Sequence, residues 1–540
     1  MGDAVDNSPV VTFAMKGSHE FQKYAFTIAV TIVVLTVHVL LQKYLWKPLR
    51  MRRIMTKQGV AAAPFHIVVG SLPECFAFMS KYSGDLHVDD HYDATPTVSP
   101  MNTLYFPKNE NFFLYAWGSE QRLTTRDPEF VKEVLLTRSS DFGRAKLNAY
   151  ILGQIIGHES LATVEEDPVH ATHRRILNPY FFPEAIKAMV NSMVEGTVST
   201  LQMWEEKVKQ GGGVAEFDVQ PDVHAISGKI ISLAAFSNDF ETGRQIYENQ
   251  KSIIEIVFKS LGSLLFYIPG SRFLPTKQNK EVARLQKANH DLLANVIEKR
   301  KKAVANGTEV TYGNDLLGHM LRALEGKGAS ADFNLKSVFN NAEAFYFAGQ
   351  DTVASAMNFA LLMLARHPEW QDRARKEVNE VCGSRNDTID AAKLNRLKTV
   401  GMIINETLRL FVPLPKLPRE AKKDMQIGSV FVPKGMIVEI SMQAMNLDPR
   451  FWGDDVFKFN PERFANGTAK ACTHPQAFVP FSIGPRVCIG NNFAMLELKV
   501  VIATILQRFE ILVSPSYKHH PYLNLITRPK YGLPLILKAL

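Results

Sequence analysis

One cysteine lies in a glycine-framed segment just before a predicted helix over residues 491–509. The segment reads Phe481-Ser482-Ile483-Gly484-Pro485-Arg486-Val487-Cys488-Ile489-Gly490. A helix N-terminus favours the thiolate form of a nearby cysteine, and the thiolate is the form that binds a metal. Gly484 accepts backbone angles that other residues avoid, and Gly490 lets the chain pass close to a flat, bulky group. Arg486 is placed to pair with a carboxylate of that group. Cys488 is therefore a candidate metal ligand.

This segment resembles the haem-binding loop of the cytochrome P-450 superfamily, whose pattern F-x-x-G-x-R-x-C-x-G it fills at every fixed position. The resemblance implies haem b (iron protoporphyrin IX) as cofactor, with Cys488 as the axial ligand of the iron. A thiolate ligand pushes electron density toward O–O cleavage. The resemblance also implies cofactor contacts from Phe481, Gly484, Arg486 and Gly490. The alternative is a buried free cysteine that acts as a small hydrophobic side chain.

A second motif lies in the long helical pattern of residues 335–366, which Pro368 ends. It reads Ala348-Gly349-Gln350-Asp351-Thr352. Glycine inside a helix costs about 0.8–1 kcal/mol relative to alanine, so Gly349 indicates a close approach to the backbone. The motif is similar to the family signature A-G-x-D/E-T. That likeness implies a local helix distortion that forms a groove for dioxygen, with Thr352 and Asp351 as catalytic residues.

In that resemblance Thr352 hydrogen-bonds the distal oxygen and Asp351 relays protons from solvent. Cleaving the O–O bond requires two protons delivered to one oxygen, and a hydroxyl backed by a carboxylate does this. The alternative is a helix with a stray polar cluster.

Glu406 and Arg409 are three residues apart on a predicted helix and share a face. Arg463 follows in Asn460-Pro461-Glu462-Arg463-Phe464. The resemblance implies that the three form a buried salt-bridge triad on the proximal side of the cofactor pocket. We expect a structural role, because removing one member leaves an uncompensated buried charge. For each residue taken alone, surface ion pairing is the alternative.

Two more arginines match positions that contact the haem propionates in the family. Residues 170–179 resemble the helix W-x-x-x-R, with His170 in the tryptophan position and Arg174 as the propionate contact. A solvated arginine is the alternative there. Arg419, after Pro418, stands where the family often has a propionate-binding arginine. Asn446 occupies a position where relatives often carry histidine, which leaves one propionate contact in doubt.

The chain that positions these residues has 540 residues, 46% hydrophobic and 21% charged, which is ordinary for a globular protein with a sizeable core. A prior of about 150 residues per domain suggests several units. No glycine- or serine-rich linker follows residue 70, so we expect one large catalytic unit. The net charge of +8 is spread along the chain, which argues against nucleic acid as a partner. The cysteines form no C-x-x-C pair, which favours a reducing, cytosolic environment.

Residues 24–42 carry no formal charge. As a helix they span about 28 Å, close to the hydrocarbon thickness of a bilayer. Basic residues crowd the C-terminal flank, and the positive-inside rule then keeps the following domain in the cytosol. A cleaved signal peptide and a buried globular helix are the alternatives. The expected organisation is a polar, weakly structured lumenal segment (1–23), a transmembrane helix (24–42), a basic linker (43–64) and a haem-thiolate monooxygenase domain (65–540).

The resemblance covers nearly the whole chain and implies the cytochrome P-450 fold, mainly α with a smaller β-rich part, behind an N-terminal transmembrane helix. Residues 112–117 and 430–441 read as strands. Residues 142–163 correspond to a loop over the haem. Residues 215–303 are mostly helical, and the apolar run 253–268 either roofs the substrate pocket or forms a core helix.

These motifs imply a monooxygenase of the endoplasmic reticulum membrane, single-pass and with its catalytic domain in the cytosol. It inserts one oxygen atom from O2 into a lipophilic small molecule, and it looks like the plant clan that acts on terpenoids, hormones and fatty acids. Residues 489–540 are too few for a flavin domain, so electrons are expected from a separate NADPH-cytochrome reductase. The alternatives are a haem-thiolate isomerase or dehydratase that acts on a peroxide without O2, and a haem sensor or carrier. Asp351 and Thr352 argue against both.

Overall fold

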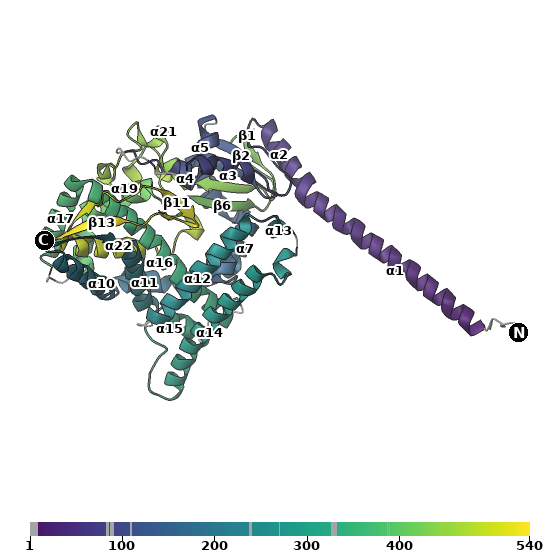
Figure 1. The fold of residues 1–540 in the computed structure, drawn as a ribbon, viewed down its shortest axis with the longest axis horizontal. Coiled ribbons are helices and arrows are strands. Elements are labelled where there is room, and N and C mark those ends of the chain that lie inside the picture. Colours follow the sequence, from purple (N-terminus) through teal and green to yellow (C-terminus); the bar gives the residue numbers. More distant parts are fainter. Residues whose placement is uncertain are drawn as a thin grey trace.

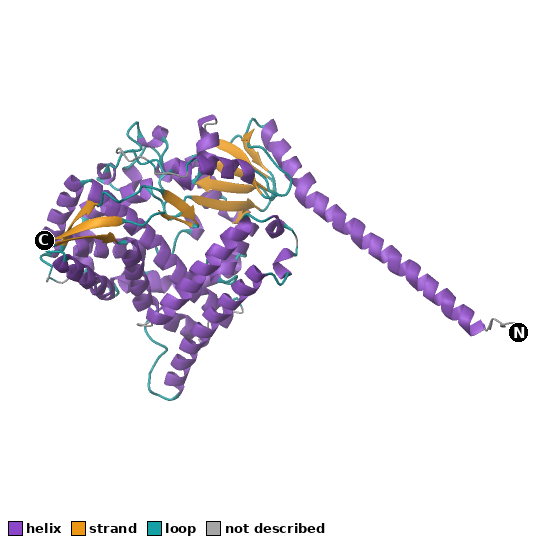
Figure 2. Cartoon of the chain, in the orientation of Figure 1, coloured by secondary structure: helices purple, strands orange, loops and turns teal. Residues whose placement is uncertain are grey.

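The computed structural model describes residues 9–82, 86, 91–108, 111–236, 240–268, 270–325, 332–385, 387 and 389–540. Helices make up most of this part of the chain, and the strands form four sheets that are spread across the upper half of the body in this view (Figures 1 and 2). The expected class, mainly α with a smaller β-rich part, is confirmed.

A long N-terminal helix projects from the body (Figure 1). Helix α1 (Pro9–Leu41) continues through the π-helical turn η1 (Gln42–Trp46) into α2 (Lys47–Lys57). Its apolar side chains are exposed; Phe26, for example, is 72% exposed. Among the described residues, one helical stretch, Tyr24–Lys57, is long and apolar enough to cross a membrane.

The expectation of a weakly structured N-terminal segment is wrong for residues 9–23, which belong to α1. The basic segment expected as a linker likewise continues the helix as far as Lys57. Two features explain this. Lysine, arginine and methionine have high helix propensity, and Pro48 stands in the first turn of α2, where proline is tolerated.

The largest sheet has six strands in the order β1-β2-β3-β9-β6-β4. Its strands are β1 (Ala61–Ala62), β2 (Phe112–Trp117), β3 (Glu120–Thr125), β4 (Phe142–Arg144), β6 (Lys416–Ala421) and β9 (Ile437–Ser441). The strands of the smaller sheets are β10 (Phe509–Val513), β13 (Pro534–Ala539) and β5 (Val214–Asp218); β11 (Pro521–Asn524) and β12 (Ile526–Pro529); and β7 (Met425–Ile427) and β8 (Val430–Val432). The strands predicted over 112–117 and within 430–441 are confirmed.

The remaining α-helices are α3 (Leu72–Lys81), α4 (Thr95–Val98), α5 (Pro100–Tyr105), α6 (Pro128–Lys132), α7 (Lys146–Ile156), α8 (Asp167–Leu177), α9 (Pro183–Lys187), α10 (Val190–Gln210), α11 (Gln220–Phe236), α12 (Phe240–Leu261), α13 (Leu264–Tyr267), α14 (Lys277–Ala305), α15 (Leu316–Glu325), α16 (Leu335–Arg366), α17 (Pro368–Cys382), α18 (Ala391–Arg396), α19 (Lys398–Leu410), α20 (Met442–Asn446), α21 (Pro449–Trp452) and α22 (Asn491–Leu506). The predicted C-terminal helix is shorter than expected, because the chain turns into strand β10 at Phe509.

Helix α16 runs through the centre of the body (Figure 1), and its second half is almost entirely buried. It begins with a capping box in which the Asn334 side chain accepts from the Ser337 backbone N–H, and it ends before Pro368. The predicted bounds 335–366 are confirmed. Helices α11, α12, α19 and α22 all pack against it. Helix α16 carries the 348–352 motif and contacts α22, which follows the Cys488 loop, so it connects the two motifs.

Two other predictions are settled by this packing. Residues 142–163 do not form a simple loop: most of the segment is β4 followed by α7, whose apolar side chains Ile151, Ile155 and Ile156 are buried. In the apolar run 253–268, α12 buries Ile253 and Ile254 in the same hydrophobic cluster. That part of the run is a core helix.

Candidate active site

The Cys488 loop follows a short 3-10 turn (Gly484–Arg486) and leads directly into α22. The backbone N–H of Cys488 donates to the Phe481 carbonyl oxygen at 2.9 Å, which closes the loop. The Cys488 side chain is exposed. The surrounding protein is nevertheless dense enough that burial raises the pKa of its thiol, against the opposing effects of a backbone hydrogen bond at Gly490 and the charge of Arg174.

Two glycines shape this loop in different ways. Gly484 has a φ of +78°, and a Cβ there would lie 2.1 Å from the Leu135 carbonyl oxygen, so only glycine fits. A Cβ at Gly490 would meet nothing within 4 Å. The backbone at Gly490 therefore borders open space beside an exposed cysteine, and a flat prosthetic group fits there.

Four arginines converge near this loop from four separate segments. Arg144 on β4 lies directly opposite Arg419 on β6 in the antiparallel pair. Arg174 on α8 donates to the Val487 carbonyl oxygen, which precedes the cysteine. Arg486 forms an ion pair with Asp167 at 2.9 Å. We call Arg144, Arg174, Arg419 and Arg486 the arginine cluster.

The arginine cluster has more positive charge than its surroundings balance. Burial and the charge of Arg486 lower the pKa of Arg419 to about 10. Burial and the charges of Arg486 and Arg419 hold the pKa of Arg144 well below its ordinary value. Burial and the same positive field lower the pKa of His170 to about 3, so it is neutral. Asp167 is the one carboxylate with an ion pair to the cluster among the described residues.

This imbalance tests whether the site suits haem. A buried positive cluster is stable when an anion compensates it, and the two propionates of haem b supply two carboxylates. Within the described part of the chain the Arg419 side chain donates one hydrogen bond, to the Pro418 carbonyl oxygen, which leaves donors for such a ligand. The exposed Cys488 thiol, the open space beside Gly490 and the excess positive charge of the arginine cluster together fit haem b.

Asp351 and Thr352 occupy neighbouring positions on α16 with different surroundings. The Thr352 hydroxyl is partly exposed and donates to the Ala348 carbonyl oxygen at 2.6 Å. Asp351 is buried: it accepts from the Tyr247 hydroxyl at 3.0 Å and from Arg528 at 2.7 Å. His224 lies 3.8 Å from the carboxylate oxygen that also accepts from Tyr247, and burial lowers the pKa of that histidine to about 4.

Gly349 differs from its expected role. Helix α16 is α-helical from Leu335 to Arg366, so its backbone does not show the expected local distortion. The glycine is required because a Cβ would lie 2.8 Å from the Ile231 side chain of α11, and the Ser227 hydroxyl donates to its carbonyl oxygen at 3.3 Å. The close approach predicted from Gly349 therefore comes from a crossing helix.

Glu406, Arg409 and Arg463 lie together. Glu406 and Arg409 are fully buried and form a bidentate pair with both N–O distances at 2.7 Å. Arg463 is 3.6 Å from Glu406 and pairs more closely with Asp455, at 2.7 Å. Arg409 also donates to three backbone carbonyl oxygens, including that of Asn446. The triad thus joins α19 to the segment that precedes the cysteine loop.

Sequence reasoning missed several residues of this site. Arg144 belongs to no recognised motif and reaches the cluster only because β4 pairs with β6. Tyr247, Arg528 and His224 meet Asp351 from α12, β12 and α11. No local pattern links them, since they lie far apart in the sequence.

Comparison with known proteins gives independent evidence for the family of this chain. Residues 100–535 match the family described as Cytochrome P450. The chain belongs to the cytochrome P450 family. It is 33% identical to cytochrome P450 734A2 of Oryza sativa subsp. japonica over 96% of this chain and 95% of that one. It is 32% identical to 7-deoxyloganic acid hydroxylase of Catharanthus roseus over 96% and 99%.

The fold agrees with a solved structure of the family. The crystal structure of the cytochrome P450DA heme domain superposes with a TM-score of 0.73 over 89% of this chain and 98% of that chain, at 21% sequence identity. The predicted cytochrome P450 fold is confirmed. So are haem b as the cofactor, the monooxygenase class and the likeness to plant P450s. The apolar helix of α1 fits membrane anchoring.

Proposed function

We propose that this P450 oxygenates a lipophilic small molecule of the terpenoid, steroid-like hormone or fatty acid type. Electrons come from a separate NADPH-cytochrome reductase. The protein lies in the endoplasmic reticulum membrane, anchored by α1 with its catalytic domain in the cytosol. Two plant relatives that align over most of this chain support a plant metabolite as the substrate. One of these relatives is named 7-deoxyloganic acid hydroxylase.

In this proposal Cys488 is the axial ligand of the haem iron, and the arginine cluster binds the propionates. Phe481 and Gly484 hold the cysteine loop in shape, and Gly490 gives the ring its space. The bound haem supplies the oxygen-activating redox chemistry, with the thiolate favouring O–O cleavage. Glu406, Arg409 and Arg463 fix the proximal side of the pocket.

The observation that carries the proposal is the hydroxyl–carboxylate pair on α16. Thr352 is partly exposed, so its hydroxyl can hydrogen-bond a reacting oxygen and deliver a proton to it. The Asp351 carboxyl is held by Arg528 and Tyr247, and it stands next in the chain to replenish that proton. An enzyme that rearranges a peroxide without O2, or a haem carrier, has no use for such a pair.

Apolar side chains flank the same helix. Ala344 and Phe347 of α16 share a hydrophobic cluster with Ile155 of α7, Ile254 of α12 and Ile526 of β12. Substrates that approach these elements meet hydrocarbon, and burying apolar surface there contributes about 25 cal/mol per Å². This environment favours a lipophilic substrate over a charged one.

Product analysis tests this function. Purified holoprotein in lipid vesicles is supplied with a reductase, NADPH and a panel of terpenoids, sterols and fatty acids, and products are identified by mass spectrometry under ¹⁸O2. We expect one class to gain a single labelled oxygen, dependent on NADPH. Turnover of a lipid peroxide without NADPH, and no labelled product from any panel member, would instead support the isomerase or dehydratase.

A further inference from the structure

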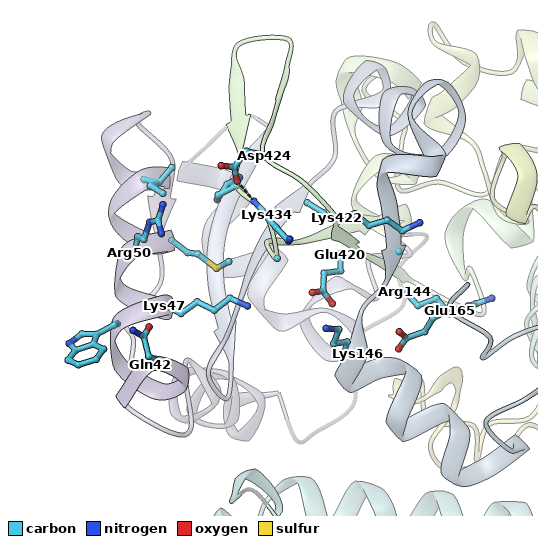
Figure 3. A pocket seen from close by; sticks show the side chains of 17 residues that line it. Gln42, Lys47, Arg50, Arg144, Lys146, Glu165, Glu420, Lys422, Asp424 and Lys434 are labelled. Atoms are coloured by element: carbon cyan, nitrogen blue, oxygen red, sulfur yellow. Dashed lines mark hydrogen bonds between the residues drawn. The ribbon is translucent and has the colours of Figure 1, made fainter. Parts of the chain in front are cut away.

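A cavity of about 960 Å³ lies where the N-terminal helix meets the body (Figure 3). One wall comes from η1 and α2, between Gln42 and Ile54. The opposite wall comes from β4, the start of α7 and the end of β6, and residues 433–435 after β8 close it. The volume is that of a ligand site, because such pockets commonly have about 300–1,000 Å³.

The cavity is rich in cationic side chains. Those that line it are Lys47, Arg50, Arg144, Lys146, Lys422 and Lys434. Three carboxylates also line it: Glu165, Glu420 and Asp424. Burial raises the pKa of Glu420 from its ordinary value, against the opposing charges of Lys146 and Lys47.

Several of these cations lack a protein counter-ion. Lys422 is paired with Asp167 at 2.6 Å. Among the described residues, the side-chain nitrogens of Lys47, Arg50, Lys146 and Lys434 form no ion pair within 4.0 Å. The carboxylate of Asp424 accepts from the backbone N–H of Lys434 at 2.6 Å, and the charges of Lys146 and Lys47 act on Glu420 from a distance. Lys47 extends from α2 into the cavity, toward the strand that carries Glu420 (Figure 3), and its ammonium lies 3.0 Å from where a Cβ on Gly435 would stand. Unpaired ammonium groups around one space are suited to a phosphate.

The place of the cavity in the chain indicates the source of that phosphate. Gln42, Trp46 and Lys47 directly follow the apolar part of α1 and lie on the cavity wall. In a membrane-spanning helix, residues at this point reach the lipid headgroups, where tryptophan and basic residues are favoured. Basic pockets beside such a helix on the cytosolic side bind anionic headgroups.

We propose that this cavity binds the phosphate headgroup of an anionic phospholipid, with Lys47, Lys146 and Lys434 as its principal contacts. The inference rests on the proposed membrane anchoring by α1. Arg144 forms the inner wall and also belongs to the arginine cluster, so the headgroup site adjoins the cofactor site without sharing its ligands from α8 or the cysteine loop. The headgroup fixes the angle between α2 and the sheet.

The test uses full-length holoprotein reconstituted in nanodiscs of phosphatidylcholine with one fifth phosphatidic acid. After mild detergent release, native mass spectrometry counts the lipids that stay bound. We expect retained phosphatidic acid to exceed its share in the disc. The triple variant Lys47→Gln, Lys146→Gln, Lys434→Gln should lower the ratio of retained phosphatidic acid to retained phosphatidylcholine at least tenfold or to the ratio in the disc, since each basic residue near a membrane surface contributes about fivefold.

A matched variant changes three exposed lysines elsewhere, Lys209→Gln, Lys299→Gln and Lys301→Gln. It removes the same charge and should keep the enrichment. Equal losses in both variants would overturn the site in favour of general surface charge. Retention of the two lipids in the proportions of the disc would also overturn it, because the protein would then have no preference for phosphatidic acid. Displacement of the lipid by millimolar inorganic phosphate would show a small-anion site and overturn the lipid assignment.

Two controls separate this inference from the anchoring on which it rests. Flotation with phosphatidylcholine vesicles reports insertion of α1. Failure to float overturns the anchoring, whereas flotation without enrichment of phosphatidic acid overturns the headgroup site alone. The absorption spectrum of the triple variant reports cofactor binding and should match that of the unchanged protein.

Discussion

Arg144 and Arg419 are direct cross-strand partners in the β4–β6 pair, although both are cationic and neither is more than partly exposed. Like charges placed opposite each other destabilise a sheet. Arg174 and Arg486 add to the same field. A bound dianion would compensate these charges, and in the proposed function the haem propionates would supply it.

Replacing Arg419 by glutamine should therefore weaken cofactor retention without weakening the apoprotein. The loss of a hydrogen bond to a charged group corresponds to about 1.5–3 kcal/mol, so haem should leave at least tenfold faster. Transfer of haem to apomyoglobin measures this rate. The apoprotein should unfold at the same or a higher temperature, because one like-charge contact is removed.

The exposed Arg244→Gln variant on α12 is the control and should release haem at the unchanged rate. If Arg419→Gln retained haem as long as this control does, the arginine cluster would have no role in binding the propionates.

The buried pair of Glu406 and Arg409 should contribute strongly to stability. Glu406→Gln leaves a buried guanidinium without its counter-charge, and such losses cost about 3–5 kcal/mol. We expect a much lower midpoint of chemical unfolding, followed by tryptophan fluorescence. Glu241→Gln removes the same kind of Glu–Arg pair, three residues apart on an exposed helix face, and should leave the midpoint unchanged. Equal effects would show that the clamp is an ordinary surface pair.

The carboxyl group of Glu497 on α22 predicts a pH dependence. Both of its oxygens are buried, and within the described part of the chain neither has a hydrogen bond of normal geometry, since the nearby Ser227 hydroxyl donates to the Gly349 carbonyl oxygen. Burial raises the pKa of Glu497 from 4.5 to about 8, against the smaller opposing effect of Ser227. Between these values the folded protein keeps a proton that the unfolded chain releases. Stability contributed by this group is therefore present at pH below 4.5 and falls as the pH rises to 8.

Glu497→Gln should remove that dependence. At pH 8.5 the variant should be more stable than the unchanged enzyme by on the order of a few kcal/mol, and near pH 5 the two should be similar. Urea unfolding at both pH values measures the difference, with the exposed Glu195→Gln as control. A stability gain that is the same at both pH values would contradict a protonated buried carboxyl.

Thr352→Ala tests the proton relay on α16. NADPH consumption should continue while product falls, and hydrogen peroxide should account for the difference. Positioned proton transfer contributes about 10²–10⁴-fold, so product formed per NADPH should drop by at least an order of magnitude. Thr504→Ala removes a hydroxyl with the same contact to a carbonyl four residues earlier, on α22, and should stay coupled. Unchanged coupling in Thr352→Ala would exclude its hydroxyl from the relay.

Sequence patterns predicted the features of this enzyme that residues close together in the chain determine. The start and end of α16 follow from its capping residues and Pro368, and the Cys488 loop from its fixed glycines. The extension of α2 to Lys57 was missed because basic residues suggested a linker, while their helix propensity decided the structure.

Tertiary pairing decided the rest. Arg144 joins the arginine cluster through the register of a three-residue strand. Arg528 reaches Asp351 because β12 packs beside α16. The close approach predicted from Gly349 comes from the Ile231 side chain of α11, which no local pattern names. In each case the partner lies more than a hundred residues away, where single-sequence patterns carry no information.

The central claim is that the sulfur of Cys488 binds the haem iron. The direct measurement is the Soret absorption of the reduced, carbon monoxide-treated holoprotein. We expect the long-wavelength maximum typical of thiolate coordination, and a shift to the shorter-wavelength maximum of imidazole coordination in Cys488→His. A haem-loaded unchanged protein without the thiolate maximum, or a Cys488→His protein that kept it, would contradict the account.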